Sequence, residues 1–218
     1  MSTQSIRKNL RIPGPTPVVR SIQTEMARDM QAFGDPRFVA DYKELIDSLA
    51  DLFNCSGKTF PIAGTGTLAM EMAVANTTKR GDKVLVVSNG YFGDRFIEIC
   101  ERKGLLTTVL SAPWGSAVTT EQIDAALAQG GFSAVIVSHV DTSTGVLADI
   151  AAIGHMMKKH PDIIYIVDGV AATGAEFVDV DGMGIDILFT GWQKAFGVCP
   201  GMVVLWASQK ALARRKTL

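Results

Sequence analysis

Short apolar runs alternate with amphipathic runs along most of this 218-residue chain, and this alternation constrains the fold more than any other feature. Most of the apolar runs are continuous stretches of valine, isoleucine and leucine, which is typical of strands buried on both faces. Strands and helices that alternate in this way favour a mainly parallel α/β sheet. The predicted strands span residues 60–62, 83–87, 106–110, 134–138, 163–167, 185–190 and 202–206, and the predicted helices 68–76, 94–103, 121–128 and 150–159.

The first 55 residues follow a different pattern. A proline-rich run at residues 13–17 predicts a rigid, extended entry to the fold. Two helices are then expected, the second beginning near Pro36, because apolar residues recur at helical spacing. We expect both apolar stripes to pack into the core. The stripes consist of Val19, Ile22, Met26 and Met30 in the first helix, and Phe38, Tyr42, Leu45, Ile46, Leu49 and Leu52 in the second.

Composition and charge exclude several classes of protein. The chain is 47% hydrophobic and 20% charged, which is enough to build a sizeable core. A net charge of −1 gives no electrostatic reason to expect nucleic acid or a membrane as a partner. Three widely spaced cysteines do not make a disulfide framework, and no apolar run approaches the ~20 residues of a membrane span. We therefore expect a soluble cytoplasmic protein.

An amine and an acid each follow a predicted strand. Lys194 lies in the turn after residues 185–190, and Asp168 directly follows residues 163–167. A lysine at the mouth of a sheet is well placed to act as a nucleophile. Together the two groups suit a ligand with a cationic ring and a carbonyl, and pyridoxal phosphate has both. The structural alternatives are a lysine that anchors a turn and an aspartate that caps a helix.

Three other strand ends carry polar or aromatic groups. The Gly-Thr-Gly-Thr run at residues 64–67 can bring a helix start close to an anion, or its threonines can simply cap that helix. Phe92 can stack on a planar ring, or cover the sheet edge. After residues 134–138, His139 is a candidate acid or base and Thr142 a candidate donor, in the crevice where open α/β sheets bind ligands. Both can equally be structural, with Thr142 closing a turn.

Three motifs in this chain resemble one family. They are the Gln-Lys-Ala step at residues 193–195, the Val-Asp-Gly-Val-Ala run at 167–171 and the Thr-Ser-Thr-Gly loop at 142–145. The chain resembles the class V aminotransferases, which are pyridoxal-phosphate enzymes of fold type I, and above all the alanine–glyoxylate and serine–glyoxylate group. The resemblance runs from Pro13 to Trp206.

The resemblance implies a domain plan and an assembly. Residues 1–55 would form an N-terminal arm with helices, and residues 56–218 a cofactor-binding large domain with a mainly parallel seven-stranded sheet. Relatives continue for about 100 residues or more. That part supplies a small domain, which this chain lacks, and the arginine that binds the substrate carboxylate. Relatives are homodimers, so we expect a homodimer here too.

The resemblance also implies roles for individual residues. Lys194 would be the catalytic residue, bonded to the cofactor aldehyde and acting as general base, and Asp168 would pair with the ring nitrogen. Phe92 takes the place of a tryptophan that stacks on the ring in many relatives. No metal is expected. The remaining cofactor-binding residues implied are Thr142 near the ring oxygen, and Thr65, Gly66, Thr67 and Gln193 around the phosphate.

The implied reaction is transamination between a small amino acid, alanine or serine, and glyoxylate or a similar 2-oxo acid. Three alternatives stay open. Class V lyases and desulfurases share the fold but typically carry a histidine before the lysine, where this chain has Gln193. A non-catalytic or incomplete cofactor-binding fragment is the second. The third, a nicotinamide-binding domain, lacks the full spaced-glycine fingerprint and its acidic partner.

Overall fold

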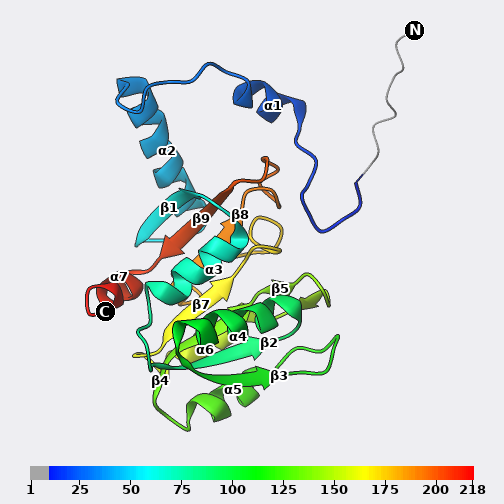
Figure 1. The fold of residues 1–218 in the computed structure, drawn as a ribbon, viewed down its shortest axis with the longest axis vertical. Coiled ribbons are helices and arrows are strands. Elements are labelled where there is room, and N and C mark those ends of the chain that lie inside the picture. The colour runs from blue at the N-terminus through cyan, green and yellow to red at the C-terminus, as the bar shows by residue number, and fades with distance from the viewer. Residues whose placement is uncertain (1–9) are drawn as a thin grey trace.

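The computed structural model describes residues 10–218, and it shows a seven-stranded sheet between layers of helices (Figure 1). The strand order is β1-β9-β8-β7-β4-β2-β3. Every predicted strand is present, so the expected α/β sheet is confirmed. The strands are β1 Lys58–Ala63, β2 Lys83–Ser88, β3 Leu106–Ser111, β4 Phe132–Ser138, β7 Ile164–Asp168, β8 Ile187–Gly191 and β9 Met202–Ala207. Residues 1–9 lie outside the described part of the chain.

The direction of the strands places their carboxyl ends together. β3, β2, β4, β7 and β8 are joined by parallel pairing, whereas β9 runs antiparallel to both of its neighbours, β8 and β1. All strands of this sheet except β9 therefore point the same way. Loops that follow them meet at one edge, where open α/β sheets bind ligands.

Alternate side chains of the central strands pack into two hydrophobic cores, one on each face of the sheet. In β2, Val84 and Val86 pack with α3 and α4, whereas Leu85 and Val87 pack with α5 and α6. All four side chains are buried, which explains why these strands read as continuous apolar runs. The helices are α3 Gly66–Ala75, α4 Tyr91–Lys103, α5 Thr120–Leu127, α6 Ile150–Met157 and α7 Gln209–Arg215.

A two-stranded hairpin was not predicted. It consists of β5 Val140–Asp141 and β6 Val146–Leu147, which pair antiparallel around the Thr-Ser-Thr-Gly loop. Each strand has only two residues, too few to show a period in the sequence. Among residues 10–218 no helix is both long and apolar enough to cross a bilayer.

The expectation that both N-terminal helices bury an apolar stripe is wrong. α1, Arg20–Met26, has no buried residue and ends before Met30, whose side chain is 98% exposed. α2, Pro36–Leu52, buries only Leu49. The reason is its position, because α2 projects beyond β1 and contacts the sheet through its C-terminal end (Figure 1). There the buried Trp206 Nε1 donates to the Leu49 carbonyl at 2.9 Å.

Candidate active site

The loops after β1, β2, β4, β7 and β8 surround a cavity of about 200 Å³. Every residue to which the family resemblance gives a role lines it, whereas the candidate His139 does not. These residues are Thr65, Gly66, Thr67, Phe92, Thr142, Asp168, Gln193 and Lys194. The lining is completed by Met70, Val140, Val170 and Ala171. These four are apolar and carry no chemical signal, so sequence reasoning had no means of selecting them.

Asp168 is a buried carboxyl group at the end of β7. It is 4% exposed, its Oδ1 accepts a hydrogen bond from Val170 N at 2.9 Å, and no described residue forms a salt bridge with it. Burial raises the pKa of Asp168 to about 7, although the Val170 bond and the charge of Lys194 act in the opposite direction. No helix begins after Asp168, which removes the helix-cap alternative. The site therefore holds a buried acid that has no salt-bridge partner among the described residues.

Lys194 lies in a tight turn just beyond β8. Its N–H donates to Gly191 O at 3.2 Å, and its carbonyl accepts from Gly197 N at 3.0 Å. Partial burial lowers the pKa of the Lys194 amine, while the charge of Asp168 pulls it back up. A lowered pKa leaves more of the amine neutral, and the neutral form is the nucleophile. The cavity is thus lined by both an amine and a buried acid.

The start of α3 offers backbone donors to the cavity. Thr65 is the N-cap, and its side chain accepts from Leu68 N at 3.3 Å, so the capping interpretation of this threonine is confirmed. The first backbone bond of the helix is Ala69 N to Thr65 O, which leaves the amides of Gly66 and Thr67 ahead of it. A Cβ at Gly66 would stand 3.5 Å from Val170 Cγ2, so glycine keeps this part of the cavity open. Such a helix start favours an anion.

Asp141 is a functional candidate that sequence reasoning missed. This buried carboxylate accepts from Phe92 N at 2.9 Å and Gly93 N at 3.3 Å, and from Ser143 N at 3.0 Å and Ser143 Oγ at 2.7 Å. It therefore ties the start of α4 to the loop that carries Thr142. The available signal was an acidic residue placed between a buried strand and a Thr-Ser-Thr-Gly turn.

His139 is not brought into the site. It lines a separate hollow with Leu147 and Phe177. Its N–H donates to Asp168 O at 2.9 Å and its carbonyl accepts from Ala148 N at 2.8 Å. Burial lowers the pKa of the imidazole, which favours its neutral form. This geometry favours the structural interpretation of His139 over a role as acid or base.

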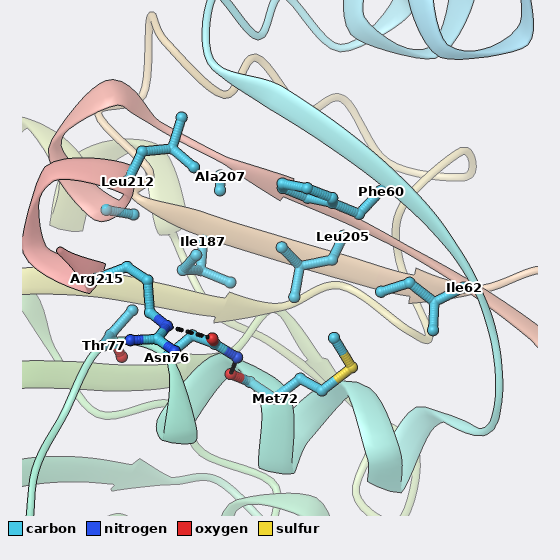
Figure 2. Close-up of a pocket in the computed structure, with 11 residues that line it drawn as sticks. Phe60, Ile62, Met72, Asn76, Thr77, Ile187, Leu205, Ala207, Leu212 and Arg215 are labelled. Atoms are coloured by element: carbon cyan, nitrogen blue, oxygen red, sulfur yellow. Dashed lines mark hydrogen bonds between the residues drawn. The ribbon is translucent and has the colours of Figure 1, made fainter. Parts of the chain in front are cut away.

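A second hollow lies between α3, α7 and the sheet, and its lining is almost wholly apolar (Figure 2). None of the predicted site residues is in it. At its rim Arg215 Nε donates to Asn76 Oδ1 at 2.9 Å, and Asn76 in turn donates to Met72 O (Figure 2). Arg214 is held by Asp82 at 2.8 Å. Neither arginine of the last helix lines the cavity at the strand ends.

The fold and the cavity define a large domain of the fold type I pyridoxal-phosphate transferases, and the chain belongs to the class V aminotransferase family. The model of that family, described as aminotransferase class-V, matches residues 20–218. This membership confirms the resemblance, and it argues against a nicotinamide-binding domain.

Two relatives and one solved structure illustrate the match. The chain is 36% identical over 211 residues to the soluble hydrogenase small subunit of Synechococcus, covering 95% of this chain and 55% of that one. It is 34% identical to the serine–glyoxylate aminotransferase of Hyphomicrobium methylovorum, covering 98% and 54%. The crystal structure of an alanine–glyoxylate aminotransferase from Nostoc superposes with a TM-score of 0.93 at 27% identity, covering 100% and 58%. The chain thus spans about half the length of the curated relatives it matches.

Proposed function

We propose that this protein is a pyridoxal-phosphate-dependent aminotransferase that transfers the amino group of alanine or serine to glyoxylate or a similar 2-oxo acid. One observation carries the proposal: the Lys194 amine and the buried Asp168 carboxyl share a single cavity with the start of α3. The glyoxylate-dependent enzymes among the relatives support the choice of acceptor. The cytoplasmic location stays a prediction.

The residues of the cavity fit pyridoxal phosphate group by group. The amides of Gly66 and Thr67, with the hydroxyl of Thr67 and the Gln193 side chain, suit a phosphate. The buried acid Asp168 suits a protonated ring nitrogen, because it forms no salt bridge with any described residue. Phe92 offers an aromatic face and Thr142 a hydroxyl donor to the ring.

The chemistry follows from Lys194 and Asp168. When bound, pyridoxal phosphate supplies a ring that accepts the negative charge left when an amino acid loses its α-proton. Lys194 supplies the amine that holds the aldehyde. In its free form, the Lys194 Nζ would be the base that takes the α-proton of the substrate and returns it. As a carboxylate, Asp168 would keep the ring nitrogen protonated, and the positively charged ring would then take up that negative charge.

Trapping of the lysine tests this function. The protein is incubated with pyridoxal phosphate, reduced with borohydride and analysed by peptide mass spectrometry. We expect the pyridoxyl mass on Lys194, and its loss in Lys194→Ala but not in Lys158→Ala, which removes an exposed lysine. Undiminished cofactor binding and lysine bonding in Lys194→Ala would contradict the assignment. Formation of pyruvate from alanine and glyoxylate then tests turnover.

A second candidate function is cofactor binding without turnover by these residues alone. Because the chain spans only 54–55% of these relatives, groups that act on the substrate in them can lie outside the aligned part. Trapping at Lys194 without pyruvate formation would support this candidate. Release of sulfide from cysteine would instead support the desulfurase alternative, for which structural neighbours at 18% identity show the fold alone.

We also propose that the protein is a homodimer that uses its N-terminal segment as the interface. The division into an arm with helices at residues 1–55 and a cofactor domain at 56–218 stays a prediction. In support, this segment exposes large apolar side chains, including Met30 and Phe33 at 98% and 91% exposure. Phe33→Asp should shift the protein toward monomer in sedimentation velocity. Leu106→Asp, an exposed change on the β3 edge strand, should not.

A further inference from the structure

The proline-rich segment at residues 13–17 lies against the turn that carries Lys194. Thr16 forms two hydrogen bonds there: its N–H donates to Gln193 O at 2.8 Å, and its hydroxyl donates to Lys194 O at 2.7 Å, with Gln193 O at 3.2 Å as a second, weaker acceptor of the same proton. The two segments are separated by 177 positions in the sequence. The segment is therefore fastened to the backbone of the lysine itself.

Gly14 and Pro13 contact the side chain of the same lysine. A Cβ at Gly14 would stand 2.6 Å from Lys194 Cδ and 2.9 Å from Nζ, so the lysine side chain occupies the space that the glycine leaves. Lys194 Nζ donates to the Pro13 carbonyl at 3.4 Å. The backbone of residues 13–14 thus lies directly against the side chain of Lys194.

We propose that Thr16 is a positioning residue for Lys194. This inference rests on the proposed function, because it concerns the same amine. A lysine has four flexible carbons between backbone and amine, so its reactivity depends on how firmly its backbone and its side chain are held in place. The Thr16 hydroxyl fixes the backbone of the lysine, and Gly14 with Pro13 fixes the path of its side chain. Thr16 itself does not touch the reacting atoms.

The test compares four proteins: wild type, Thr16→Val, Thr16→Ser and Thr24→Val. Thr24 is the matched control, because its hydroxyl also donates to a backbone carbonyl, that of Arg20 at 2.9 Å, but within α1. Two rates are measured by peptide mass spectrometry: bonding of pyridoxal phosphate to Lys194, trapped by borohydride, and acetylation of Lys194 by acetic anhydride without cofactor. The exposed Lys158 is the internal reference.

We expect Thr16→Val to lower both Lys194 rates, relative to Lys158, by about five- to tenfold, the effect of one lost hydrogen bond. Thr16→Ser should restore them, and Thr24→Val should match wild type. Wild-type rates in Thr16→Val, or failure of Thr16→Ser to restore them, would overturn the inference. If Thr16→Val does not fold, Gly14→Ala against Gly201→Ala tests the path of the lysine side chain, because both glycines have a positive φ and a Cβ at Gly201 meets nothing within 4 Å.

The two rates separate this inference from the proposed function. If wild type forms no bond with pyridoxal phosphate at Lys194, the proposed function fails. The acetylation rate still decides whether Thr16 positions the amine. If wild type bonds the cofactor and Thr16→Val does so equally fast, the inference fails and the proposed function stands.

Discussion

The carboxylate of Asp141 accepts a hydrogen bond from the backbone N–H of Phe92, and the Oδ2 and N atoms are 2.9 Å apart. The same carboxylate accepts from the N–H and the hydroxyl of Ser143. One buried acid therefore connects the helix start that carries Phe92 to the loop that carries Thr142. Since both residues line the cavity, its width on this side depends on Asp141.

Asp141→Ala should lower the free energy of unfolding by about 2–4 kcal/mol, because the donors on Phe92, Gly93 and Ser143 lose a charged, buried acceptor. Urea unfolding measures this loss. The control is Asp35→Ala at the exposed start of α2, where one capping bond to Arg37 N is lost and about 1 kcal/mol is expected. Equal losses in the two variants would show that the Asp141 network adds nothing beyond an ordinary cap.

The stability of the cofactor-free protein should fall as pH rises from about 4 to about 7. The pKa of Asp168 is raised from 3.8 to about 7, so within this window the unfolded chain releases the proton while the folded protein keeps it. The loss should reach at most about 4 kcal/mol, at about 1.4 kcal/mol per unit of pKa difference. This loss of stability should be complete once the pH exceeds the pKa of Asp168 in the folded protein.

Urea unfolding at pH 5 and pH 8 checks this slope. Asp168→Asn should remove the contribution of Asp168 to it. Asp149→Asn, an exposed change at the start of α6, should leave the slope in place. A slope that persists unchanged in Asp168→Asn would assign the pH dependence to other groups.

Asp168→Ala should weaken the binding of pyridoxal phosphate by about 100-fold or more, because a buried cation would lose its anionic partner. Equilibrium dialysis measures the dissociation constant. Lys194→Ala removes the covalent bond but keeps the acid, so a double variant shows how far the two effects are independent. Wild-type affinity in Asp168→Ala would contradict the assigned ring contact.

Gly154→Ala should destabilise the protein by about 1–3 kcal/mol, although alanine is the better helix former by about 1 kcal/mol. A Cβ at Gly154 in α6 would stand 1.7 Å from Met183 O, so helix and loop must separate. Ala151→Gly on the exposed face of α6 is the control, and it should cost about 1 kcal/mol through helix propensity alone. A stabilised Gly154→Ala protein would contradict the close approach.

Local patterns predicted the sheet and most of the cavity because the strands are buried on both faces and their loops share one edge. They failed for α2, since an apolar stripe indicates that one face of a helix tends to be buried but does not show which element buries it. They missed Asp141, because two of its partners, Phe92 and Gly93, lie on α4 and are distant in the sequence. The contacts of Thr16 with Lys194 join the two ends of the fold, and no local period encodes such a pairing.

Strand β1 lies at the edge of the sheet and pairs only with β9, so the strands of the sheet must pair in a set order during synthesis. Strands β2, β3, β4 and β7 can pair as they leave the ribosome, but β1 must wait until Met202–Ala207 have emerged. The turn after β1 carries Thr65 and Gly66, so this corner of the cavity forms only after β9 has emerged. A nascent chain should therefore gain affinity for pyridoxal phosphate only once Met202–Ala207 have emerged, and refolding should be limited by this distant pairing.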